Sequence, residues 1–213
     1  MVVLNDKLLF PPVSMANQEG LLAIGGDLSS ERLLLAYRNG IFPWYNEDEP
    51  IQWYCPDPRF VLFPEELNIS KSMRTVLNNG SFRFTINKNF KEVIENCKTI
   101  SRKEQDGTWI HPDMVTAYTK LHEAGFAISA EAWKNGTLAG GLYGILIGKV
   151  FFGESMFSKV SNASKFAFIK MIQYLQKQNI ALIDCQVYTP HLESLGASMI
   201  SRNEFIERIN KAI

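Results

Sequence analysis

Apolar runs with a period of two indicate strands in the later two thirds of the chain. Residues 126–133 and 137–147 form two such runs, joined by Asn135-Gly136, which is the strongest short hairpin signal. Three further runs predict strands at residues 82–86, 150–153 and 180–187. Together they predict an α+β fold with a mixed, mainly antiparallel sheet.

Capping residues mark the helices expected between these strands. Asn89 with Glu92 three residues later is a capping-box pattern, and Pro112 and Gly125 suit a helix start and end. Predicted helices run from Ser70 to about Leu77, from Asn89 to about Lys98, from Pro112 to Gly125, over residues 163–178, and from Ser201 or Asn203 onward.

The first part of the chain has few strand signals and many breakers. Ser29 or Ser30, with Glu31 in the first turn, caps one helix, which Gly40 ends. The two prolines within residues 55–59 predict an extended connector. We therefore expect a small N-terminal domain at residues 1–62 and a larger domain at residues 63–213.

Large aromatic residues are dense in the N-terminal part, outside any periodic element. Two interpretations are open: a small core of their own, or a platform on which a nucleic-acid base stacks. The residues are Phe42, Trp44, Tyr45, Trp53 and Tyr54.

Composition excludes several classes of protein. The chain has 213 residues with 46% hydrophobic content, and no apolar run reaches the roughly eighteen residues of a membrane helix. Cys55, Cys97 and Cys185 are odd in number and lack metal spacing, so we expect neither a disulfide framework nor a zinc site. The first residues lack the pattern of a signal peptide. We expect a reduced cytoplasmic protein without a cofactor.

Charge is unevenly distributed although the net charge is zero. Residues 1–66 carry four basic and ten acidic side chains, whereas residues 71–103 carry eight basic and two acidic ones. This asymmetry suggests an anionic partner for the middle segment, although a solvated helix face is also consistent with it.

Two acidic residues close apolar runs and suggest an active site. Glu154 follows residues 150–153, and Asp184 lies in the run at residues 180–187. The side-chain period of two places Asp184 and Gln186 on one face of their strand. A carboxylate beside a carboxamide suits an amine that attacks a carbonyl. Both acids could instead simply lie in water at strand ends.

Motifs along nearly the whole chain resemble one protein family. They are residues 20–28, 40–44, 56–59, 107–110, 140–144, 153–158, 162–165, 184–186 and 194–197. As an ordered set they resemble the leucyl/phenylalanyl-tRNA–protein transferases. The resemblance implies a small N-terminal domain joined to a GNAT-like acyltransferase domain. It also implies transfer of Leu or Phe, and Met less, from aminoacyl-tRNA to proteins that begin with Arg or Lys, which marks them for N-end-rule degradation.

The resemblance also implies roles for individual residues. Asp184 and Gln186 would carry out transfer, Glu154 would hold the cationic acceptor peptide, and Trp44 and Trp109 would flank the terminal adenosine of the tRNA. The aminoacyl pocket would consist of Leu142, Phe151, Met156, Phe168, Leu175 and Ile183. From the charge pattern, Lys71, Arg74 and Lys88 would contact the tRNA backbone.

Two other functions fit parts of the sequence. The order of elements also suits an acetyl-CoA-dependent N-acetyltransferase, but the turn at residues 158–165 lacks the glycines that would cradle a pyrophosphate. A non-catalytic adaptor for tRNA or peptide is the other alternative, and the Asp184–Gln186 pair argues against it. The chain also departs from the family pattern at Ile128 and Thr189, which concerns the acceptor side.

Overall fold

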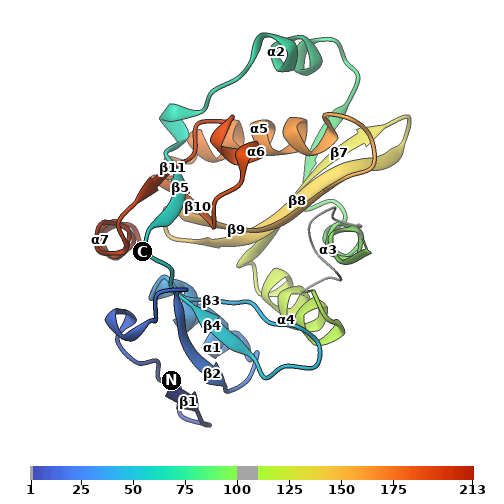
Figure 1. Cartoon of the computed structure of the whole chain (residues 1–213). Helices are drawn as coiled ribbons and strands as arrows, with labels where there is room; N and C mark the ends of the chain where they lie inside the picture. Colours follow the sequence, from blue (N-terminus) through green and yellow to red (C-terminus); the bar gives the residue numbers. More distant parts are fainter. Residues whose placement is uncertain (1, 100–109) are drawn as a thin grey trace.

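The structure is a computed structural model that describes residues 2–99 and 110–213, and their strands form two sheets (Figure 1). The smaller sheet has the order β1-β2-β4-β3, with β1 (Val2–Leu4), β2 (Leu21–Gly25), β3 (Phe42–Pro43) and β4 (Gln52–Tyr54). The larger sheet has the order β11-β5-β10-β9-β8-β7-β6. Its strands are β5 (Arg59–Leu62), β6 (Arg83–Ile86), β7 (Ala127–Lys134), β8 (Thr137–Ile147), β9 (Val150–Ser158), β10 (Leu182–Gln186) and β11 (Ser198–Ile200).

The predicted fold class is confirmed, because every neighbouring pair in the larger sheet is antiparallel except β9 and β10. The predicted hairpin is β7–β8, in which Lys134 pairs with Thr137. Asn135 and Gly136 both have positive φ, at 51° and 80°. These values are those of a type I′ turn, which the Asn-Gly pair favours.

The strand that carries Glu154 is longer than the apolar pattern indicates. We predicted a strand at residues 150–153 with Glu154 at its end, whereas β9 continues to Ser158 and Glu154 lies in its middle. The extension follows β8, whose Gly140 pairs with Ser158. The prediction was wrong because the second half of β9 contains polar residues that alternation alone does not mark as strand.

Strands β9 and β10 run side by side for only three residues and then separate. Their pairing joins Leu182 to Val150 and ends where Asp184 meets Phe152. Beyond this point β9 stays with β8, and β10 stays with β5 as far as Gln186. The sheet therefore opens between β9 and β10.

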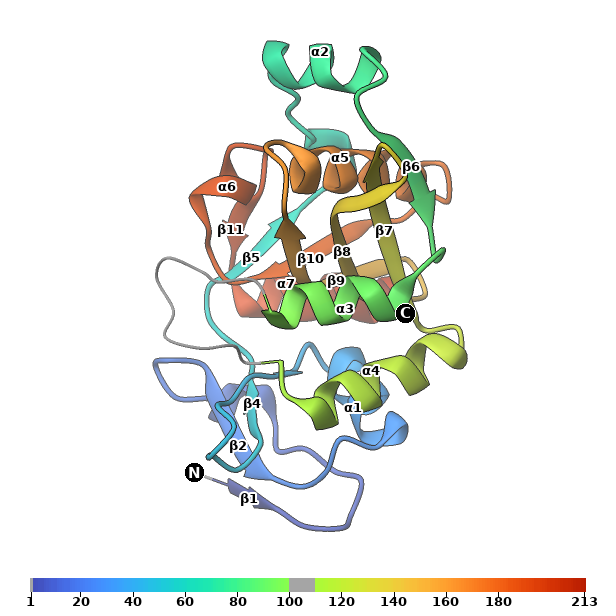
Figure 2. The ribbon, with the colours of Figure 1, turned by 90° about the vertical axis from the view of Figure 1, so that its right-hand side faces the viewer.

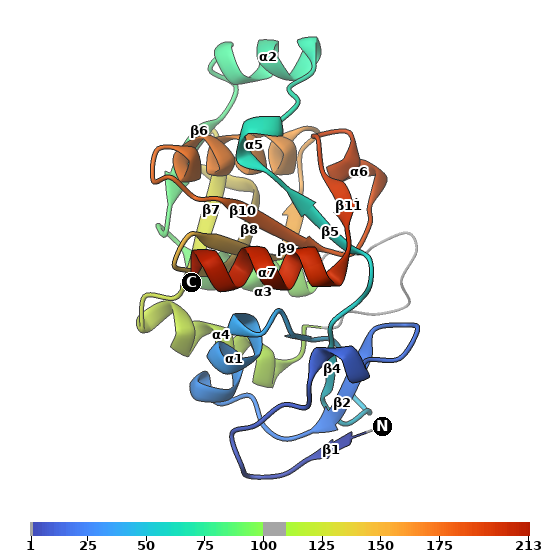
Figure 3. The ribbon, with the colours of Figure 1, turned by 90° about the vertical axis from the view of Figure 1, so that its left-hand side faces the viewer.

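Helices cover both faces of the larger sheet, in layers that are clear in Figures 2 and 3. On one face lies α5 (Ala163–Gln176), with α2 (Lys71–Asn78) outside it, and on the other lie α3 (Phe90–Thr99) and α7 (Arg202–Ala212). Beyond α3 follow α4 (Pro112–Glu123), α1 (Ser30–Arg38) and the smaller sheet, while α6 (Pro190–Glu193) follows β10. Among the described helices, none has the length and apolar character to cross a membrane.

The predicted caps start their helices as expected. The hydroxyl of Ser29 accepts from the backbone N–H of Arg32, and that of Ser70 accepts from Met73. Asn89 Oδ1 accepts the backbone N–H of Glu92, which confirms the predicted helix start. The second bond of a capping box is not formed, because Glu92 accepts from the side-chain amide of Asn89 while the backbone N–H of Asn89 donates to Glu131. Ser201, one of the two residues proposed to open the last helix, caps α7 through the N–H of Glu204.

The N-terminal part is a sheet, contrary to the few strand signals in its sequence. Its strands are two to five residues long, too short for alternation to reveal them. The dense aromatics mostly form a core: Trp53 is buried and its indole N–H donates to the carbonyl of Gly25 at 2.9 Å. Trp44 differs, because 36% of its surface is exposed.

One hydrophobic core connects the two sheets. It joins Leu22 and Tyr37 of the N-terminal part to Phe152 and Phe205, and a second core lies between the larger sheet and α5. Residues 59–62, which we assigned to the N-terminal domain, form β5 in the larger sheet. We therefore propose that the domains divide between Tyr54 and Arg59.

Candidate active site

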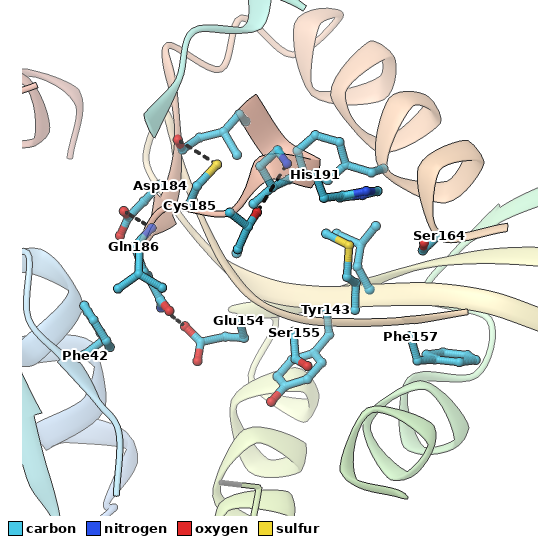
Figure 4. A pocket seen from close by; sticks show the side chains of 18 of the residues that line it. Phe42, Tyr143, Glu154, Ser155, Phe157, Ser164, Asp184, Cys185, Gln186 and His191 are labelled. Carbon is cyan, nitrogen blue, oxygen red and sulfur yellow. Dashed lines mark hydrogen bonds between the residues drawn. The ribbon is translucent and has the colours of Figure 1, made fainter. Parts of the chain in front are cut away.

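A cavity of about 830 Å³ opens where β9 and β10 separate (Figure 4). Strands β9 and β10 line it, together with β3 from the N-terminal part and the segment that leads into α6. Figure 4 shows Glu154, Asp184 and Gln186 on one side of this cavity, with His191 and Ser164 on the other. A volume of this size is typical of a small-molecule site.

The Glu154 carboxylate connects the two separating strands. Gln186 Nε2 donates to Glu154 Oε1 at 2.8 Å, and the Tyr118 hydroxyl donates to Glu154 Oε2 at 3.0 Å. Tyr37 in turn is hydrogen-bonded to Tyr118 through the two hydroxyls. Gln186 adopts a positive φ of 64°, which is uncommon for a residue with a side chain. The carboxamide therefore reaches Glu154 through a turn of the backbone, not through regular strand geometry.

Burial gives Glu154 an unusual proton affinity. Only 9% of its surface is exposed, and this burial raises its pKa to about 7, with the charge of Asp184 adding to the rise. The hydroxyls of Tyr37 and Tyr118 and the carboxamide of Gln186 oppose part of the shift. A carboxyl group with such a pKa exchanges protons near neutrality and can act as a general base or acid.

Asp184 is held by Arg59 and does not have a free carboxylate. Arg59 donates from Nε to Oδ1 at 2.8 Å and from Nη2 to Oδ2 at 2.6 Å, and both residues are fully buried. The guanidinium lies between the rings of Phe42 and Phe205, at 4.7 and 4.5 Å from their centres. Asp184 Oδ1 also accepts the backbone N–H of Gln186 at 2.9 Å. Asp184 thus fixes the backbone that carries Gln186.

Glu154→Gln is expected to stabilise the folded protein at pH 8. A buried acid with a raised pKa stabilises the fold below its unfolded pKa of about 4.5, and this stability is lost as the pH rises to about 7. Gln removes the loss, so the free energy of unfolding should rise by up to ~3 kcal/mol at pH 8 and by almost nothing at pH 4. Urea unfolding at both pH values measures it; equal differences at both would contradict a raised pKa.

The expected aminoacyl pocket lies only partly on the cavity. Leu142, Met156, Phe168 and Ile183 line it. Phe151 and Leu175 do not: both are fully buried and belong to the core beneath α5, behind the lining residues. The reason is that β9 and α5 each contribute some side chains to the cavity lining and others to the core, and Phe151 and Leu175 are among the core residues.

The expected tRNA-contacting residues are not all near the cavity. Trp44 lines it, and Trp109 falls outside the described residues. Lys71 and Arg74 lie on α2 and, like Lys88, are exposed and do not line the cavity. Their proposed contact with the tRNA backbone stays a prediction.

Several site residues had no role assigned from the sequence. Tyr37 lies within the helix predicted between Ser29 and Gly40, and Arg59 ends the predicted connector, but neither was given a role in the site. Tyr118 carried no signal in the sequence at all. A clue was available for Arg59, because a charged residue directly before the apolar run at residues 60–63 must find a partner if it is buried.

The turn before α5 is already filled by its own hydrogen bonds. The Ser158 hydroxyl accepts the N–H of Ser164 at 3.3 Å and donates to the carbonyl of Val160 at 2.8 Å. The N–H of Ala163 donates to that same carbonyl at 3.0 Å. The N–H groups of Ala163 and Ser164, two of those that a pyrophosphate would need, are thus engaged, which argues against acetyl-CoA.

Comparison with known proteins gives a consistent result. The profile described as "Leucyl/phenylalanyl-tRNA protein transferase" matches residues 61–210, and that of its N-terminal domain matches residues 26–57. The leucyl/phenylalanyl-tRNA–protein transferase of Flavobacterium johnsoniae is 62% identical over 206 residues, covering 97% of each chain. That of Christiangramia forsetii is 56% identical over 209 residues, covering 97% of this chain and 99% of the relative.

Likeness to solved structures is weaker. A GCN5-related N-acetyltransferase from Kribbella flavida is 8% identical with a TM-score of 0.42, and the match covers 78% of this chain and 58% of that chain.

Proposed function

Because this chain belongs to the leucyl/phenylalanyl-tRNA–protein transferases, which move leucine or phenylalanine from tRNA to protein N-termini, we propose how its cavity does so. The aminoacyl ester lies between β9 and β10, with its side chain on the apolar lining. The acceptor is a protein that begins with Arg or Lys, and transfer marks it for N-end-rule degradation in the cytoplasm. The supporting observation is the buried Glu154 carboxyl, whose pKa of about 7 suits proton uptake from an amine.

Glu154 is suited to receive the cationic acceptor. Among the described residues the cavity lining contains two acids, and Asp184 is already neutralised by Arg59. In the part of the chain that the structure describes, the hydrogen-bond partners of the Glu154 carboxylate are uncharged donors. An N-terminal Arg or Lys carries two positive charges, one on its side chain and one on its α-ammonium. Both are attracted by the negative charge of Glu154.

The transfer step balances with Glu154 as the proton acceptor. The α-ammonium, with an ordinary pKa of about 8, gives one proton to Glu154 and becomes a neutral amine. Its nitrogen attacks the ester carbonyl carbon, the C–N bond forms, and the C–O bond to the ribose of the tRNA breaks. The second proton lost by the nitrogen passes to the departing ribose oxygen. Gln186, whose Nε2 is bonded to Glu154, can orient the amine with its carboxamide oxygen.

This assignment changes the roles that we inferred for Asp184 and Glu154 from the sequence. We expected Asp184 to serve the transfer step directly and Glu154 mainly to hold the acceptor. Both Asp184 oxygens are bonded to a buried guanidinium, so proton uptake there would leave Arg59 without its counter-charge. Asp184 therefore positions Gln186, and Glu154 both attracts the acceptor and takes its proton.

The cavity lining favours unbranched or γ-branched apolar groups. Leu142, Met156, Phe168 and Ile183 provide apolar contacts for Leu and Phe, and for Met less. β-Branched Ile and Val should fit less well, although the discrimination available from one methylene is only about 1–3 kcal/mol.

Transfer of labelled leucine from Leu-tRNA to short peptides tests this function. We expect labelling of peptides that begin with Arg or Lys, and at least tenfold less of matched peptides that begin with Gln, since one lost charge pair of about 1.5 kcal/mol gives such a factor. Val-tRNA is the control for the aminoacyl side. Equal labelling of all peptides would contradict a charge-selective acceptor site.

Binding of tRNA should separate into a stacking part and an electrostatic part. Trp44→Ala should weaken tRNA binding by about 1–3 kcal/mol without changing its salt dependence, because stacking involves no counterion release. A Lys71/Arg74/Lys88 triple alanine variant should reduce the slope of log K against log salt by roughly two to three. Filter binding at four salt concentrations measures both. A wild-type slope in the triple variant would show that these cations are only a solvated surface.

A further inference from the structure

A buried chain of hydrogen bonds crosses four elements and ends in the N-terminal part of the molecule. It runs from Gln186 on β10 to Glu154 on β9, then to Tyr118 on α4 and Tyr37 on α1. Tyr37 and Tyr118 are 1% and 0% exposed, so neither hydroxyl exchanges its partner for water. The transfer step as described above uses neither phenol.

We propose that Tyr118 and Tyr37 are positioning residues for transfer, which orient the Glu154 carboxylate and keep it competent in both its charged and its protonated form. This inference rests on the proposed role of Glu154 as the proton acceptor. Through Tyr37, helix α1 of the N-terminal part then contributes to the active site.

The two phenols can serve both forms because each hydroxyl is a donor and an acceptor. When Glu154 is charged, Tyr118 donates to Oε2 and Tyr37 donates to Tyr118. When Glu154 is protonated, its own O–H can donate to Tyr118, and Tyr118 then donates to Tyr37. Reversal of the chain leaves the link between Glu154 and Tyr118 intact in either form. With Tyr37 present, Tyr118 keeps an acceptor for its own O–H in the second form, and the O–H left over is that of Tyr37 at the far end of the chain.

The surroundings of Glu154 support this assignment. From β10 and β5 the charges of Asp184 and Arg59 oppose each other. From β8 the ring of Tyr143 contacts that of Tyr118, with centres 5.6 Å apart. Burial and the Glu154 charge raise the pKa of both chain phenols well above the ordinary value, so they stay protonated and act only through their hydrogen bonds.

The test compares three Tyr→Phe variants of the full chain. Tyr118→Phe and Tyr37→Phe each remove one hydroxyl of the chain, and Tyr45→Phe is the matched control. Tyr45 is also buried, but its hydroxyl donates to Asp113 and is not a member of the chain. Two readouts are followed: the ¹³C NMR titration of the Glu154 carboxyl, assigned with Glu154→Gln, and the pH profile of kcat/KM.

Tyr118→Phe should raise the Glu154 pKa from about 7 to about 8–9, because a hydrogen bond to the charged form is lost. At pH 7 this should lower kcat/KM by about five- to fiftyfold, with recovery at pH 9. Tyr37→Phe should shift both readouts in the same direction, and it carries the test if Tyr118→Phe does not fold. Tyr45→Phe should leave both unchanged.

The outcomes separate the inference from the proposed function. An unshifted titration in Tyr118→Phe and Tyr37→Phe, with Glu154→Gln still slow, overturns only the inference and leaves the phenols as packing groups. A wild-type rate in Glu154→Gln overturns the role of Glu154 and the inference with it. A shift of equal size in Tyr45→Phe overturns the inference too, because the effect would then not pass through the chain.

Discussion

Asp184→Asn is expected to lower the free energy of unfolding by about 3–5 kcal/mol, because it leaves the buried Arg59 charge without its partner. For a chain of 213 residues this corresponds to a fall of roughly 6–20 °C in Tm. Glu204→Gln is the matched control, since it breaks the half-exposed pair with Arg208 and should cost less than about 1 kcal/mol. Thermal unfolding followed by circular dichroism measures both.

A double variant separates stability from function at the same pair. Arg59→Met with Asp184→Leu removes both charges, and apolar replacement of a buried pair is often neutral or stabilising by about 1–4 kcal/mol. The double variant should therefore regain most of the stability lost in Asp184→Asn. It should still transfer slowly, because Leu cannot accept the N–H of Gln186. A stable and fully active double variant would rule out positioning by Asp184.

Glu154→Gln is expected to lower the transfer rate by about 10²–10⁴-fold at pH 8, the usual contribution of a general base. In the wild type, kcat/KM should rise with pH through about 7, as Glu154 loses its proton, and this inflection should vanish in the variant. Single-turnover transfer to an Arg-ending peptide, measured from pH 5.5 to 9, tests both.

The stability of the same variant provides the control. Glu154→Gln should be at least as stable as the wild type at pH 8, so a slow rate cannot be ascribed to unfolding. If the variant keeps the wild-type inflection near pH 7, another group controls the reaction, and Glu154 is then only a contact for the acceptor.

Sequence patterns predicted those elements that are determined by residues close together in the chain. The β7–β8 hairpin follows from alternation and from Asn135-Gly136, and the helix starts follow from residues such as Ser70 and Ser201. The N-terminal sheet was missed because its strands are too short to show a period and are held by partners far along the chain.

The sequence predicted several residues of the site, but not which side chains bond to one another. Glu154, Asp184 and Gln186 do lie together, as two strands with acids suggested. The partner that decides the role of Asp184 is Arg59, 125 positions away, and no periodicity links the two. Gln186 meets Glu154 because of its positive φ, which a rule of alternating faces does not anticipate.

The shared core described above has a consequence for how activity is lost. Tyr37 and Phe42 come from the N-terminal part, while Glu154 and Asp184 come from the larger sheet, so neither part contains the site by itself. Because Tyr37 and Phe152 belong to the same core, detachment of the N-terminal part would expose apolar surface on both sides. Local opening there would separate Tyr37 and Phe42 from the groups around the carboxylates, so activity would be lost even while the larger sheet stays folded. Activity therefore depends on the contact between the two parts as well as on the sheet that carries the carboxylates.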